Sequence, residues 1–141
     1  DGGLAVFTMK LAVTKSTLPF ANAFVLGIMC NMLVCLAVLA SLSAKDTAGK
    51  IAGVFFPISF FVICGFEHCV ANMYYIPAGI FAATVPEYAA KAAEAGVNLS
   101  ALTWSGFFIG NLIPVTLGNL AGGLAVGILM WLGHAWEKEK K

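Results

Sequence analysis

Residues 65–77 read GFEHCVANMYYIP and place two ionisable side chains, Glu67 and His68, next to each other between long apolar runs. Neither the run before them, IAGVFFPISFFVIC (51–64), nor the run after them, CVANMYYIPAGIFAATV (69–85), carries a charge. By length and composition both runs are typical of membrane interior. An ionised group at the bilayer centre costs about 2.5 to 3.5 kcal/mol, so such residues usually serve an ion path, a proton relay or a ligand. The stretch therefore predicts a functional site inside a membrane segment.

The composition of the whole chain supports this interpretation. The 141 residues are 60% hydrophobic and 11% charged, whereas about 25% of the residues in a soluble domain are charged. No charge occurs from Ser16 to Ala44 or from Ala95 to Trp136. We therefore predict an all-α integral membrane protein. A soluble enzyme is excluded by these apolar runs, and the net charge of +1 offers no basic face to nucleic acid.

Gaps between the charges divide the chain into three predicted transmembrane spans, at about 20–42, 51–85 and 106–135. A polar loop with a short helix at EYAAKAAEA (87–95) separates the second span from the third. The four cysteines lie in the apolar segments without a CxxC pair, so we interpret them as small packing residues and expect neither a metal site nor a cofactor.

The second span is too long for one straight crossing. Its 35 residues would extend about 52 Å as a helix, against a hydrocarbon core of about 30 Å. Pro57 and Pro77 flank Gly65, so we predict a helix broken near 65–72. Broken backbone inside a bilayer is tolerated where protein or a water-filled path covers it, which indicates a pathway.

Glu67 and His68 are expected to have separate roles, because adjacent helical residues point about 100° apart. We expect Glu67 to face the protein interior and to accept hydrogen bonds from backbone N–H groups freed by the break. His68 is expected to face the pathway, where it can donate a hydrogen bond or a proton to a small anion. The positive dipole at the N-terminus of a half-helix also favours an anion.

The third span carries small residues four apart, Gly118 with Gly122 and Gly123 with Gly127, a spacing typical of close helix packing in membranes. Pro114 removes one helical hydrogen bond, so a second broken helix is also expected there.

Lysine counting predicts the orientation. Three spans alternate sides, so the 45–50 loop and the C-terminal tail lie on one side, with Lys45, Lys50, Lys138, Lys140 and Lys141. The other side has Lys10, Lys15 and Lys91. The excess of positive charge places the C-terminus in the cytoplasm.

Three strings carry a family resemblance: GFEHCVANMYYIPAGI (65–80), NLIPVTLGNLAGG (111–123) and STLPFANAFVLGIMCNMLVCLAV (16–38) after Lys15. Together they resemble the formate/nitrite transporter family of bacterial channels. The resemblance implies an aquaporin-like, six-span protomer with inverted repeats, assembled as a homopentamer in the inner (cytoplasmic) membrane, with a pore through each protomer. This chain corresponds to spans four to six. The first half of the family domain is absent, so either the sequence is a fragment or another chain completes the pore.

The resemblance also implies roles for individual residues. His68 matches the central pore histidine, and Glu67 matches the glutamate that ties down the loop at the break. Phe61 matches the aromatic residue that narrows the pore, and Lys15 matches the lysine that draws anions to the vestibule. The family's asparagines, which follow the histidine by one turn or orient it from flanking spans, correspond to Asn72, Asn31 and Asn119.

Formate is the anion favoured by NLIPVTLGN (111–119), which resembles the formate-channel version of this stretch. Nitrite and hydrosulfide channels of the same family remain alternatives.

Two alternative functions belong to other classes of membrane protein. A haem-binding anchor would need His68 and His134 to bind one iron. His68 is at mid-span and His134 near the interface, so they would differ in depth by about 15 Å. A proton or cation transporter would need Glu67 in the lumen.

Overall fold

The computed structural model describes residues 2–139, with side chains to Trp136, and within that range it is helical without strands. The helices are α1 (Gly3–Ser16), α2 (Phe20–Ser43), α3 (Thr47–Ile63), α4 (Cys69–Ala82), α5 (Pro86–Glu94) and α6 (Ile113–Glu139). A 3₁₀ turn lies at Leu99–Ala101, and a π-helical segment at Gly106–Leu112 runs directly into α6.

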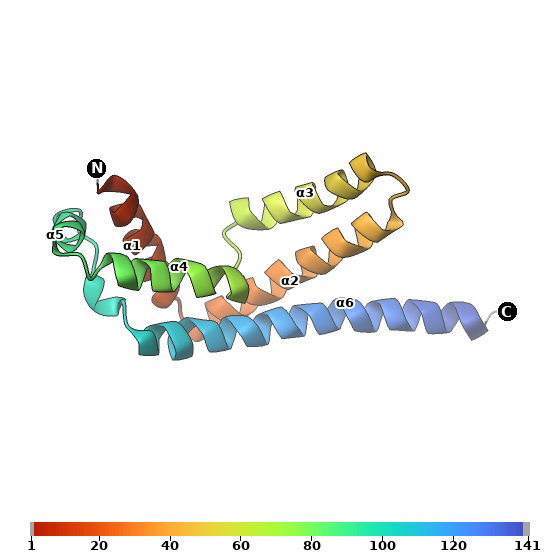
Figure 1. The fold of residues 1–141 in the computed structure, drawn as a ribbon. Helices are drawn as coiled ribbons and strands as arrows, with labels where there is room; N and C mark the ends of the chain where they lie inside the picture. The colour runs from red at the N-terminus through yellow and green to blue at the C-terminus, as the bar shows by residue number, and fades with distance from the viewer. Residues whose placement is uncertain (1, 140–141) are drawn as a thin grey trace.

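The arrangement has two packed groups joined at the break between α3 and α4. α2 packs along α6 on one side and α3 on another, and α1 packs against α4. α2 and α6 run in the same direction, so the α2–α3 loop and the end of α6 lie at one end of the molecule (Figure 1). α1 begins at the opposite end, beside α5 (Figure 1). The 45–50 loop and the C-terminal end of α6 therefore share one end of the molecule, as predicted. Lys15, which was counted on the opposite side, instead lies at the helix break, where it pairs with Glu67. Lys140 and Lys141 lie outside the described residues, as does the side chain of Lys138.

Two helices among the described residues are long and apolar enough to cross a membrane, Phe20–Ser43 and Gly106–Trp136. α3 and α4 are also apolar but shorter, with 17 and 14 residues. At 1.5 Å per residue they would cover about 26 Å and 21 Å, less than the hydrocarbon core. Only together could they cross it.

The second segment is broken, over 64–68 rather than the expected 65–72. α3 ends at Ile63, α4 begins at Cys69, and the chain between them is not helical. Gly65 has a φ of 68°, a left-handed conformation that costs other residues about 1 to 2 kcal/mol. The break therefore uses the one residue type in the stretch that adopts this conformation freely.

The seam between α2 and α6 depends on glycine, as the spacing of Gly118 and Gly122 predicts, whereas Gly127 of the second predicted pair has nothing within 4 Å of an added Cβ. A Cβ at Gly118 would meet the backbone carbonyl of Phe24, and one at Gly122 would meet that of Ile28. Gly27 contributes from the α2 side, where an added Cβ would lie 2.9 Å from the carbonyl oxygen of Val115. The two backbones thus approach as closely as small residues permit.

The expectation of a second broken helix near Pro114 is wrong. The π-helical segment and α6 form one continuous helix from Gly106 to Glu139. At the junction the N–H of Ile113 donates to the carbonyl of Phe108, the wider spacing of a π turn. Because Pro114 follows at the start of α6, its missing N–H falls where the hydrogen-bond pattern already changes, and the helix continues.

Sequence patterns also omitted α1. No helix was expected before residue 20, yet Gly3–Ser16 forms one, and it buries Met9 and Ala12. Ala12 lies against Gly79 of α4, and a Cβ added at Gly79 would clash with the Cβ of Ala12. The short helix expected at 87–95 is present as α5.

Candidate functional site

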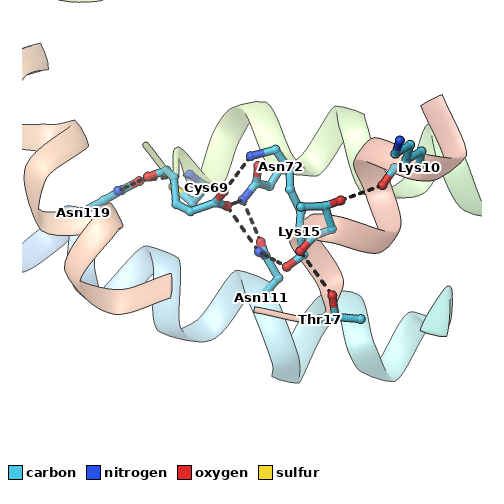
Figure 2. A network of polar contacts seen from close by, with 9 residues as sticks. Lys10, Lys15, Thr17, Cys69, Asn72, Asn111 and Asn119 are labelled. Atoms are coloured by element: carbon cyan, nitrogen blue, oxygen red, sulfur yellow. Dashed lines mark hydrogen bonds and ion pairs between the residues drawn. The ribbon is translucent and has the colours of Figure 1, made fainter. Parts of the chain in front are cut away.

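The carboxylate of Glu67 accepts hydrogen bonds from Lys15, Asn72 and Asn111 in a buried polar network. Figure 2 shows these three donors together with Asn119. Glu67 is 2% exposed. Its Oε1 accepts a hydrogen bond from Lys15 Nζ at 2.7 Å, and its Oε2 accepts one from Asn72 Nδ2 at 2.6 Å. Asn111 Nδ2 approaches the same Oε2 at 3.4 Å. The expectation that Glu67 accepts from freed backbone N–H groups is therefore wrong, because side chains from α1, α4 and the π-helical segment supply the donors.

Asn72 of α4 and Asn111 of the π-helical segment complete this network. Both are fully buried, and Asn72 Nδ2 donates to Asn111 Oδ1 at 2.7 Å. Asn111 Nδ2 also donates to the carbonyl of Lys15 at 2.9 Å. Asn111 is not among the site residues predicted from the sequence. Its burial in an apolar helix was the available signal, since buried amides need partners.

Asn119 holds the backbone on the other side of the break. Its Nδ2 donates to the carbonyls of Glu67 and Gly27, both at 2.9 Å. Its Oδ1 accepts from the N–H of Cys69 at 3.0 Å and so caps the first turn of α4. Asn31 supports it from α2, with Nδ2 donating to the Asn119 carbonyl at 2.5 Å. These two asparagines brace the break.

His68 is the N-cap residue of α4. Its Nδ1 accepts a hydrogen bond from the N–H of Val70 at 3.2 Å. A ring nitrogen that accepts cannot carry the proton, so the neutral imidazole has its proton on Nε2 and can donate from there. The ring of Phe61 lies beside it, with centroids 6.0 Å apart. With the N–H groups of Cys69 and Val70 both satisfied by side chains, the imidazole rather than these two amides is the available donor.

A pocket of about 380 Å³ opens beside the break. It gathers five of the predicted site residues, namely Lys15, Phe61, Gly65, His68 and Asn72, and excludes Glu67, Asn31 and Asn119. The remaining lining residues are Phe7, Leu11, Val62, Phe66, Ala71 and Tyr75. A larger hollow of about 520 Å³ follows α3, but Lys50 is its one ionisable residue. The smaller pocket combines an ammonium and an imidazole with aromatic walls, so we take it as the candidate site.

A broken membrane helix braced by buried amides, with an imidazole and a lysine in one pocket, defines the class as a membrane transport protein. The sequence model described as formate/nitrite transporter matches residues 2–132. The chain belongs to the formate/nitrite transporter family.

Individual relatives agree with this membership. The chain is 48% identical over 136 residues to a probable formate transporter of Methanothermobacter thermautotrophicus, covering 96% of this chain and 43% of that protein. It is 42% identical over 144 residues to the formate channel FocA of Escherichia coli K12, covering 99% and 50%.

Solved structures agree as well. A pentameric formate channel with formate bound matches with a TM-score of 0.82 and 41% identity, over 96% of this chain and 55% of that one. An ion channel of the same family matches with a TM-score of 0.70 and 30% identity, over 90% and 45%. The chain thus spans about half the length of the relatives it matches.

Proposed function

We propose that this chain forms part of a channel that passes small monovalent weak-acid anions across a membrane, with formate as the preferred substrate. The relatives' names and the formate-bound solved structure support the choice of anion. The single observation that carries the proposal is the pocket that brings Lys15 and His68 together beside the helix break. The proposed membrane is the cytoplasmic membrane of a bacterium, with the C-terminus in the cytoplasm, as the lysine distribution favours.

The side chains suggest how an anion would be handled. The ammonium of Lys15, at one side of the pocket, attracts a negative ion. The Nε2–H of neutral His68 donates a hydrogen bond to it, and the ring of Phe61 limits its size. Protonation at Nδ1 would cost the hydrogen bond from Val70 and so weaken the cap of α4. His68 therefore acts in our proposal as a neutral donor, and Phe61 with His68 forms the narrow part of the path.

The remaining wall of the pathway is proposed to come from a complementing segment, the half of the family domain that this match leaves uncovered. α3 supports this, because none of its described residues is buried and large apolar side chains such as Phe56 and Ile63 stay 69% and 83% exposed. We also propose that the protomers form a homopentamer, because a solved relative is a pentameric channel. The complete assembly below means this chain with its complementing segment.

Flux into proteoliposomes that contain the complete assembly tests the function. Formate, nitrite and hydrosulfide are measured in one preparation at two pH values, and we expect formate to be fastest. His68→Ala should change the ratio of formate to nitrite flux or its pH dependence while assembly stays intact. His134→Ala, which alters the only other histidine at the far end of α6, is the matched control and should behave as wild type. Unchanged flux in His68→Ala would remove His68 from the mechanism.

Nitrite and hydrosulfide channels remain the second candidates, because the same pocket chemistry suits any small singly charged anion. The transport rival that uses Glu67 as a relay fits less well. Glu67 is paired with Lys15 and lies outside the pocket lining.

A further inference from the structure

Tyr75 is one of the six pocket residues for which neither composition nor resemblance provided a role. It follows His68 by seven residues on α4, and both side chains line the pocket with Asn72 between them. Residues spaced four and three apart lie on one helix face, so α4 presents His68, Asn72 and Tyr75 as a stripe. Tyr75 is 37% exposed.

The ring of Tyr75 covers the ammonium of Lys15. Nζ lies over the ring, 5.9 Å from its centroid, within the range at which the ring quadrupole attracts a cation. The same Nζ donates to Glu67 Oε1 at 2.7 Å, and the lysine side chain is 12% exposed. The ammonium is therefore held between a carboxylate on the protein side and an aromatic face beside the pocket.

This placement matters because a conducting site must bind its ion weakly enough to release it. A lysine free to swing into the pocket would form a direct ion pair with a passing anion, and desolvated pairs of this kind are slow to separate. A lysine held at the wall by Glu67, which lies outside the pocket lining, turns the positive end of the ion pair towards the pocket and so still attracts the anion. The two arrangements therefore differ in how long the anion stays bound in the pocket, and in both of them the lysine attracts it.

We propose that Tyr75 is a positioning residue that keeps the ammonium of Lys15 at the pocket wall, so that Lys15 attracts anions without holding them. The aromatic face carries this role, and the hydroxyl does not. The inference rests on the proposed function, and it adds a determinant of how fast the site releases its anion.

Concentration-dependent formate flux through the complete assembly in proteoliposomes tests the inference with three variants. Tyr75→Leu removes the ring and should lower both the half-saturating formate concentration and the maximal flux, each by about threefold to tenfold, as loss of a cation–π contact of ordinary strength predicts. Tyr75→Phe keeps the ring and should restore both values. Tyr74→Leu removes the neighbouring ring, which is 71% exposed, and should behave as wild type.

Each other result would overturn the inference. A Tyr75→Leu protein with wild-type constants, or with a raised half-saturating concentration, shows that the ring does not restrain Lys15. A Tyr75→Phe protein that matches Tyr75→Leu assigns the effect to the hydroxyl. A Tyr74→Leu protein with the same shift shows that loss of any aromatic residue here suffices. Failure of the proposed function is separate, because the wild-type assembly would then pass no formate at all.

Discussion

The break between α3 and α4 and the seam between α2 and α6 hold the molecule together by opposite means. At the break, side chains from three elements, α1, α4 and the π-helical segment, converge on one carboxylate, and each bond has a specific partner. At the seam, glycines let two backbones touch, and the contact is distributed over several turns. Removing one partner of a buried ion pair leaves the other charge uncompensated. The contact between α2 and α6 is instead disrupted when an added side chain collides with the facing backbone. The break should therefore be more sensitive to loss of a group, and the seam to gain of one.

Glu67→Ala should produce the largest effect. It leaves the ammonium of Lys15 buried without its counter-ion and removes one of the two acceptors of Asn72. The expected loss is about 3 to 5 kcal/mol, measured as the free energy of unfolding of the complete assembly during SDS titration in mild detergent.

Glu67→Gln is the isosteric test of the same site and should also damage folding. The double variant Glu67→Gln with Lys15→Met should recover part of the loss, because both charges are then gone. If Glu67→Gln instead assembled with wild-type stability and only blocked transport, Glu67 would be a relay and not a brace.

Gly118→Ala should produce the next largest effect, because its Cβ would meet the backbone of Phe24, which cannot rotate away. Overpacking of this kind costs about 1 to 3 kcal/mol, and the same titration measures it. Gly127→Ala, in the same helix with nothing within 4 Å of an added Cβ, is the matched control. Equal stability of the two variants would show that the seam is looser than described.

Gly65→Ala should cost about 1 to 2 kcal/mol, a purely conformational penalty, since an added Cβ meets nothing within 4 Å. Gly65→Asn should cost less, because asparagine tolerates the left-handed region better. An alanine variant as stable as wild type would mean that residue 65 does not need a positive φ.

The pH dependence of α5 should be the smallest effect. Lys91 Nζ and Glu87 Oε1 form a surface pair at 2.7 Å. The hydrogen bond and charge of Lys91 hold the pKa of Glu87 below its usual value, and Glu87 likewise holds the pKa of Lys91 above its usual value. The stabilisation is therefore complete at neutral pH. It is lost as pH falls through the lowered pKa of Glu87 or rises through the raised pKa of Lys91.

Thermal unfolding midpoints of wild type and Glu87→Gln across pH test this prediction. The small difference between the two curves should be greatest near neutrality and vanish at low pH. A difference that grows towards low pH would contradict it.

The same contrast explains what the sequence could predict. Charge gaps, prolines and a glycine are local signals, and they predicted the break, the short helix α5 and the glycine seam. The partners at the break are not local: Lys15 and Glu67 are 52 residues apart, and Lys15 and Asn111 are 96 apart. No periodicity encodes such pairs, so the donors to Glu67 were predicted wrongly.

α1 escaped prediction for a related reason. The face of α1 that lines the pocket carries Phe7, Leu11 and Lys15. Two of these positions are apolar and the third is charged, so no continuous apolar stripe indicated a helix there. Among the residues lining the pocket, His68 and Gly65 could be named from an ionisable group and a helix break inside an apolar segment, and Lys15, Phe61 and Asn72 from the family motif. No local signal assigned a role to Tyr75, because its role depends on a contact with Lys15, which is 60 positions away in the sequence.

A density map of the complete assembly in lipid, determined with formate at saturating concentration, would show directly whether the broken helix offers His68 to the anion. We predict non-helical backbone between Ile63 and Cys69, and anion density in the pocket within hydrogen-bond distance of His68 Nε2. A continuous helix through residues 64–68, or formate bound away from an imidazole that packs among apolar side chains, would contradict it.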